Sequence, residues 1–191
     1  MPPKPSITKE QILDAAFDIV RLEGVNQLTA RSIAHKLRCS TQPVYRIYAS
    51  MDEVKNLVYD KAVALMRRHI FDYREEGNSP ALNMAIGFLH FAAREPMIFQ
   101  LVYLSGIRTY DISQDVFVGE TLAMEPMLQS QRFQALEEQQ QRDIFIKISI
   151  YLIGAGTMIQ SGTLRMGLAE AVASVREIYE ALIAYEGGRS I

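Results

Sequence analysis

Apolar residues recur at three- and four-residue spacing along the chain, and this periodicity narrows the possible folds sharply. Leu82, Ile86 and Leu89 form one such stripe, and beyond Gly77 no stretch shows the sustained apolar–polar alternation typical of a half-buried strand. Since 49% of the 191 residues are hydrophobic, the chain can bury the core of one domain or of two small ones. The sequence therefore predicts an all-α protein.

The first fifty residues carry the start and stop signals of three short helices. A helical run over residues 12–20 is ended by Gly24, because glycine fills the capping position after a helix without strain. Thr29 is the N-cap of a short amphipathic run. Ser40 is the N-cap candidate of the third helix, with Pro43 in the first turn, where a missing N–H is harmless.

Ser50 and Glu53 have the spacing of a capping box, which predicts the start of a long fourth helix. The segments expected from there on are a helix through 54–66, one over 82–93, one over 98–104, a loop at 106–113, a helix at about 115–129, one at about 136–161 and a last one over 168–182. The segment 136–161 begins polar and becomes apolar on nearly every side, so other helices must cover it.

Charge is distributed unevenly along the chain. The net charge is −2, but residues 1–50 carry seven basic and four acidic side chains, a surplus of +3 that leaves −5 for residues 51–191. No Asp or Glu occurs between Glu23 and Asp52. The acidic total argues against a nucleic-acid partner, whereas the asymmetry suggests that the amino-terminal segment binds a polyanion.

Two short helices joined by Arg38 and Cys39 have the size of a helix-turn-helix, whose second helix enters the major groove of DNA. Thr41 and Gln42 would begin that reading helix, since Gln can pair with adenine and a Thr methyl can touch the thymine methyl. Thr29, at the start of the other helix, is well placed to bind a phosphate, because free backbone N–H groups and the helix dipole favour an anion there. Further candidates for phosphate contacts are Tyr45, Tyr48 and Lys55.

A set of residues spread over about 7–58 carries a resemblance to a known family. The set is Ile12-Leu13-Asp14-Ala15-Ala16, Leu28-Thr29, Ile33-Ala34, Leu37, Val44-Tyr45-Arg46, and Tyr48 followed by Ser50 and Glu53. It resembles the DNA-binding domain of the TetR family of bacterial transcriptional repressors. The resemblance implies DNA contacts by Thr29, Arg31, Thr41, Gln42, Val44, Tyr45, Arg46 and Tyr48. The family commonly has Gly where Arg38 stands, and Arg must accept there a backbone conformation that glycine adopts more readily.

The resemblance also implies a division into a helix-turn-helix domain, residues 1–50, and a helical effector-binding and dimerisation domain, residues 51–191. Two-fold symmetry would place two reading helices about one DNA turn apart, so a dimer surface is needed. The last two helices are expected to pair with their symmetry mates through Tyr151, Gly154, Ala155, Met158, Val172, Val175, Tyr179 and Leu182. A pocket for an unidentified small-molecule effector is expected among Met66, His69, Phe88, Phe91, Phe99, Tyr103, Tyr110, Met124 and Met158, although such residues can equally fill the core.

Several classes of protein and of site are disfavoured. A single cysteine, Cys39, excludes a disulfide scaffold and a cysteine-rich zinc module and favours a cytoplasmic setting. His35, His69 and His90 lack metal-ligand spacing, so no metal and no cofactor is expected. The most apolar segment, residues 148–159, is shorter than the roughly 20 residues that span a bilayer, so no membrane partner is expected.

The sequence thus predicts a homodimeric repressor without catalytic activity, which a small-molecule effector releases from a pseudo-palindromic operator in double-stranded DNA. Two alternatives stay open: a constitutive helical DNA-binding dimer without an effector, and an all-helical enzyme whose helix-turn-helix pattern is incidental. Against the enzyme, the chain contains no nucleophile elbow, zinc-protease motif or phosphate-loop signature. A cavity beside Phe91, Phe99 and Tyr103 would favour the sensor, and a filled core would favour the constitutive binder.

Overall fold

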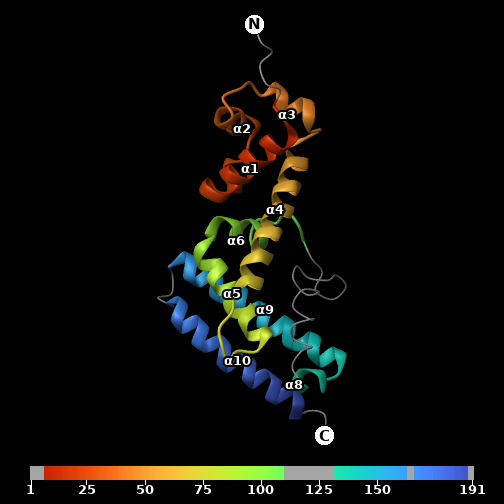
Figure 1. Cartoon of the computed structure of the whole chain (residues 1–191), viewed down its shortest axis with the longest axis vertical. Coiled ribbons are helices and arrows are strands. Elements are labelled where there is room, and N and C mark those ends of the chain that lie inside the picture. Colours follow the sequence, from red (N-terminus) through yellow and green to blue (C-terminus); the bar gives the residue numbers. More distant parts are fainter. Residues whose placement is uncertain (1–6, 110–130, 163–165, 189–191) are drawn as a thin grey trace. The chain divides into compact units, whose positions relative to one another are not determined.

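The computed structural model describes residues 7–109, 131–162 and 166–188, and every regular element in these ranges is a helix (Figure 1). The elements are α1 (Lys9–Glu23), the 3-10 turn η1 (Val25–Gln27), α2 (Ala30–Lys36), α3 (Gln42–Ile47), α4 (Met51–Asp72), α5 (Pro80–Arg94), α6 (Pro96–Tyr103), α8 (Gln131–Gln134), α9 (Glu138–Ser161) and α10 (Leu168–Gly188). The all-α prediction is confirmed. The helix expected at about 115–129 lies outside the described residues.

The described helices form two compact units. The first contains the described residues up to Leu65 together with Met97–Thr109, and the second contains Met66–Pro96 together with the described residues from Gln131 onward. This division differs from the boundary expected after residue 50. The Tyr59 hydroxyl donates to the carbonyl oxygen of Val102 at 3.3 Å, and Arg108 pairs with Asp60 at 2.6 Å, so most of α4 and most of α6 join the first unit.

Helix ends in the first unit follow the local signals of the sequence. Gly24 has φ +88° and its N–H donates to the carbonyl of Val20 at 2.9 Å, which ends α1 as expected. At the start of α4 the Ser50 hydroxyl accepts from the Glu53 N–H at 3.2 Å, and the Glu53 carboxylate accepts from the Ala49 N–H at 2.8 Å. The sequence interpretation missed the capping box of α1, formed by Thr8 and Gln11.

The core of the first unit lies where α1, α2 and α3 meet the start of α4. Ile12, Val20, Ile33, Val44 and Val54 are all buried there, and they come from all four helices. Because α2 and α3 are only seven and six residues long, they gain most of their stability from this packing rather than from helix propensity. The packing thus holds the α2–α3 pair as one rigid element.

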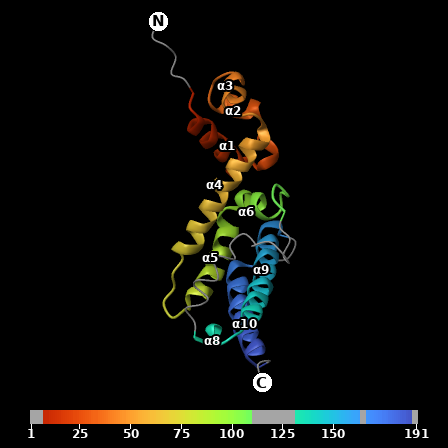
Figure 2. The same ribbon diagram turned by 90° about the vertical axis from the view of Figure 1, so that its right-hand side faces the viewer.

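In the second unit α5, α9 and α10 pack side by side, as Figures 1 and 2 both show. Ile86, Leu89, Ile144 and Val175 are buried between them. The Gln160 side-chain amide also donates to the carbonyl of Ala92 at 3.1 Å, which ties α9 to α5. The segment expected as one helix over 136–161 instead begins at residue 138, after the separate four-residue helix α8.

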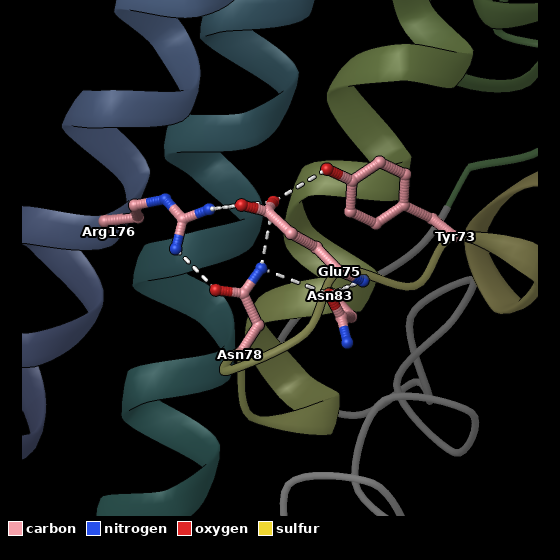
Figure 3. Close-up of polar contacts among 5 residues, drawn as sticks. All are labelled: Tyr73, Glu75, Asn78, Asn83 and Arg176. Atoms are coloured by element: carbon pink, nitrogen blue, oxygen red, sulfur yellow. Dashed lines mark hydrogen bonds and ion pairs between the residues drawn. The ribbon is translucent and has the colours of Figure 1, made fainter.

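A polar cluster fixes the loop after α4 to α10, and Figure 3 shows its five residues, Tyr73, Glu75, Asn78, Asn83 and Arg176. One Arg176 nitrogen contacts the two Glu75 carboxylate oxygens at 2.9 and 2.8 Å, and the Tyr73 hydroxyl donates to the same carboxylate at 2.9 Å. Arg176 also donates to the Asn78 side chain. The hydrogen bond from Tyr73, followed by the charge of Arg176, holds the pKa of Glu75 below its ordinary value although desolvation opposes this.

One described helix, α9, is long and apolar enough to cross a membrane by length and composition. With 24 residues it is longer than the apolar segment 148–159 alone. Core helices of soluble proteins pass the same test, and α5 and α10 pack against this one.

Candidate nucleic-acid interface

The start of α2 is built by a reciprocal cap. The Thr29 hydroxyl accepts from the Ser32 N–H at 3.0 Å, and the Ser32 hydroxyl accepts from the Thr29 N–H at 3.0 Å. Two backbone donors that would otherwise be unsatisfied are thereby paired, so the helix begins at a defined residue. Thr29 and Arg31 are exposed at this end of the helix, whereas Ala30 between them is buried.

The turn between α2 and α3 is a Schellman motif centred on Arg38. The Cys39 N–H donates to the carbonyl of Ala34 at 2.9 Å, and the Arg38 N–H donates to the carbonyl of His35 at 3.1 Å. This pair of bonds requires a left-handed residue after the helix, a position where glycine is usual. Arg38 has φ +51° and thus adopts this left-handed conformation, which is less favourable for arginine than for glycine.

Helix α3 begins at Gln42, with Thr41 as its N-cap residue and Pro43 in the first turn. The expectation that Ser40 is the N-cap is wrong by one residue, and the Thr41 side chain makes no capping hydrogen bond. Gln42, Tyr45 and Arg46 are exposed, and Tyr45 keeps 61% of its surface open to solvent. A large aromatic side chain left this open on a short helix is available to a partner.

Val44 and Tyr48 lie in the core instead, with 1% and 2% of their surface exposed. The Tyr48 hydroxyl donates to the backbone carbonyl of Lys9 at 3.0 Å, and the Lys9 ammonium lies 5.3 Å from the centre of the ring. Burial, with the nearby Glu53 charge, raises the pKa of Tyr48. This position corrects the prediction that Val44 and Tyr48 contact DNA, because their side chains hold the helices together.

Several lysines of the first unit are paired with acidic side chains. Lys36 pairs with Asp18 at 3.3 Å, Lys61 pairs with Asp14, and Lys55, predicted as a phosphate contact, pairs with Asp52 at 3.0 Å. In contrast, exposed arginines of the helix-turn-helix make no ion pair or hydrogen bond with any residue that the structure describes. These arginines are Arg31, Arg38 and Arg46. Uncompensated positive charge is therefore concentrated on α2, α3 and the turn between them.

The residues predicted to line an effector pocket are divided between the units. Met66, Phe88 and Phe91 are buried in the second unit. His69 is half-buried beside Phe91, and its Nε2 lies 3.8 Å from the buried carboxylate of Glu95, a neighbour that the sequence interpretation missed. The remaining residues are Met158, which is half-buried in the second unit, Phe99 and Tyr103, which belong to the first unit, and Tyr110 and Met124, which lie outside the described residues. The pocket therefore stays a prediction.

The predicted dimer residues differ in how much surface they offer. Tyr151, Gly154, Met158, Val172 and Leu182 are partly exposed on α9 and α10. Ala155, Val175 and Tyr179 are buried inside the second unit and so have little surface to give to a second copy. Ile150 and Tyr185, which the sequence interpretation missed, are 61% and 60% exposed on the same two helices.

No group of three or more His, Cys, Asp or Glu residues that could hold a metal ion is found within the described ranges. Cys39 is half-buried in the turn before α3.

Comparisons with known proteins agree with this architecture at the level of the fold. No family model and no curated protein sequence matches the chain. Solved structures do match over nearly the whole length. A TetR-like transcriptional regulator from a Rhodococcus species is similar with a TM-score of 0.63 and 18% identity, covering 96% of this chain and 99% of that chain.

Two further matches are of the same kind. Apo ActR from Streptomyces coelicolor is similar with a TM-score of 0.62 and 13% identity, covering 99% of this chain and 100% of that chain. A TetR variant from Acinetobacter baumannii, in complex with minocycline, is similar with a TM-score of 0.60 and 14% identity over 93% of this chain and 95% of that chain. This chain therefore has the all-helical fold of the TetR-like transcriptional regulators.

Proposed function

We propose that this protein is a DNA-binding transcriptional regulator that acts as a homodimer. The observation that carries the proposal is the rigid α2–α3 pair, on which exposed polar and aromatic side chains lie among three arginines that pair with no described residue. Such a surface supplies both terms that DNA binding needs: positive charge for the phosphates and hydrogen-bonding groups for base edges.

In the proposed complex α3 is the reading helix. Gln42, exposed in its first turn, pairs with an adenine in the major groove, and the neighbouring Thr41 contacts a thymine methyl group. Tyr45, Arg46, Thr29 and Arg31 contact phosphates and thereby hold the reading helix in register. Lys55 contributes less, because its ammonium is already paired with Asp52.

Dimerisation doubles the number of base contacts and is proposed to use α9 and α10. Two large apolar side chains, Ile150 and Tyr185, are exposed on these helices, and a large exposed apolar surface favours burial against a second copy. Two-fold symmetry then places the reading helices about 34–36 Å apart, one turn of DNA, so the operator is a pseudo-palindrome.

The regulator is further proposed to be a repressor that a small molecule releases from DNA. The minocycline bound to one structurally similar protein supports a small-molecule effector for this chain as well. An effector that prefers the conformation with the wrong spacing of reading helices weakens DNA binding by the ratio of its affinities for the two conformations.

Selection of binding sites from random double-stranded DNA tests the proposal. We expect a pseudo-palindromic site for the wild-type protein, and a weakened or relaxed preference for the double variant Thr41→Ala, Gln42→Ala. Gln27→Ala is the matched control, since Gln27 is an exposed glutamine outside α3 and its loss should leave the selected sequence unchanged. If the wild-type protein recovers no preferred sequence at moderate salt, the proposal is overturned.

A further inference from the structure

We propose that Arg38, in the turn between α2 and α3, binds a DNA phosphate and anchors the reading helix at the edge of the major groove. The proposal rests on the function proposed above and adds a contact that the helix-turn-helix pattern does not assign, because that pattern commonly has glycine at this position. Its ligand is the phosphate backbone, so it contributes to affinity and register rather than to sequence preference.

The backbone at Arg38 is unfavourable for any residue that carries a Cβ. Every other described residue with positive φ is a glycine, namely Gly24, Gly77, Gly106 and Gly162, and Arg38 is the one exception in the described ranges. In the left-handed conformation a Cβ crowds the carbonyl oxygen that follows it. Glycine would complete the same two hydrogen bonds of the turn without this strain.

Within the described ranges, no residue uses the Arg38 side chain. It is exposed, and its guanidinium makes no ion pair or hydrogen bond with the described residues. Lys36, two residues earlier and also exposed, is in contrast paired with Asp18 at 3.3 Å. Strain that folding does not require is typical of a position kept for binding.

Arg38 lies close in the chain to the start of α3, the helix that is proposed to enter the major groove. Only three residues separate it from Gln42, so their Cα atoms can be no more than about 14 Å apart even if the chain between them were fully extended. The major groove is about 12 Å wide and is bordered by phosphates on both sides. A long arginine side chain starting this near the inserted end of α3 reaches that border, where its planar fork can bind phosphate oxygens in pairs.

The salt dependence of DNA binding tests this contact in the full-length protein. Arg38→Gly removes the charge and relieves the strain, so we expect a higher melting temperature but weaker binding to both operator and random DNA. The slope of log affinity against log salt should become shallower by about 1.8 for a dimer, since each lost phosphate contact removes about 0.9. The ratio of the wild-type affinity for DNA to the affinity of Arg38→Gly should therefore fall about 12-fold between about 50 and 200 mM salt.

Two variants complete the test. Arg38→Lys keeps the charge and the strained backbone, so it should keep the wild-type salt slope. Lys36→Gln removes a charge that is already paired with Asp18, so its slope should change much less than that of Arg38→Gly. An Arg38→Gly protein that binds DNA with the wild-type slope overturns the phosphate contact. A wild-type protein that binds no DNA overturns the proposed function itself, so the two failures are distinguishable.

Discussion

Gly87 allows α5 to approach the last turn of α4 closely, and replacing it tests whether the second unit depends on that approach. A Cβ built on Gly87 would lie 2.9 Å from the carbonyl oxygen of Ile70, 3.0 Å from the Cβ of Tyr73 and 3.2 Å from the Cα of Ile70. These neighbours belong to the backbone or to the root of a side chain, so none of them can swing aside as a flexible chain end could.

Two opposing effects decide the stability of Gly87→Ala. Alanine favours the helix by about 1 kcal/mol relative to glycine. Forcing an extra methyl group into a packed interface costs about 1–3 kcal/mol, and contact with backbone atoms places this site in the upper part of that range. We therefore expect a net loss of about 1–2 kcal/mol, with the melting temperature falling by about 2–4 °C per kcal/mol for a chain of this size.

Urea denaturation followed by circular dichroism, at one fixed protein concentration, measures this difference. The control is Gly187→Ala on α10, where an added Cβ meets nothing within 4 Å and alanine should therefore be neutral or stabilising. A Gly87→Ala protein that is as stable as the wild type or more stable would refute the reasoning, because the two helices would then be able to separate without loss.

Three further predictions follow from the same structure. Thr29→Ala breaks the cap of α2 and should lower the free energy of unfolding by about 1 kcal/mol in thermal melts, whereas Thr29→Ser should keep it. Because the pKa of Glu75 is lowered, its carboxylate stabilises the folded protein at neutral pH, and this stabilisation is lost as the pH falls below the ordinary pKa of 4.5. In a curve of unfolding free energy against pH, Glu75→Gln should therefore show a flatter acid side than the wild type. Gly154→Ala adds a Cβ that meets nothing within 4 Å in the single chain, so it should leave the helix content unchanged. If α9 forms the dimer surface, sedimentation equilibrium should show a weaker dimer. An unchanged dimer dissociation constant would mean that Gly154 is not part of that interface.

The candidate site was predictable to the extent that its signals are local. Thr29 and Ser50 could be identified as helix starts because their capping partners lie three residues away in the sequence. The inward and outward faces of α3 were not separable in this way. Six residues are fewer than two helical turns, so periodicity does not determine which of Val44 and Tyr45 is buried.

Contacts between distant residues also lay beyond the sequence interpretation. Lys61 forms an ion pair with Asp14, which lies 47 residues earlier in the chain. The loop after α4 is held by Arg176, which lies about 100 residues further on. Nothing in the spacing of these residues signals that they meet. Their pairing depends on how the helices pack, and that packing is a property of the whole unit.

The sequence by itself determined that this protein is all-helical, where several helices begin and end, and that positive charge gathers in the first fifty residues. Each of these properties follows from interactions within one or two helical turns or from simple composition. Only the tertiary structure decided that Val44 and Tyr48 are core residues, that Lys36 and Lys61 are paired, and that Arg38 has a strained backbone while its side chain pairs with no described residue. The physical reason is that burial and ion pairing depend on neighbours brought together by folding, whereas helix capping depends on neighbours in the chain.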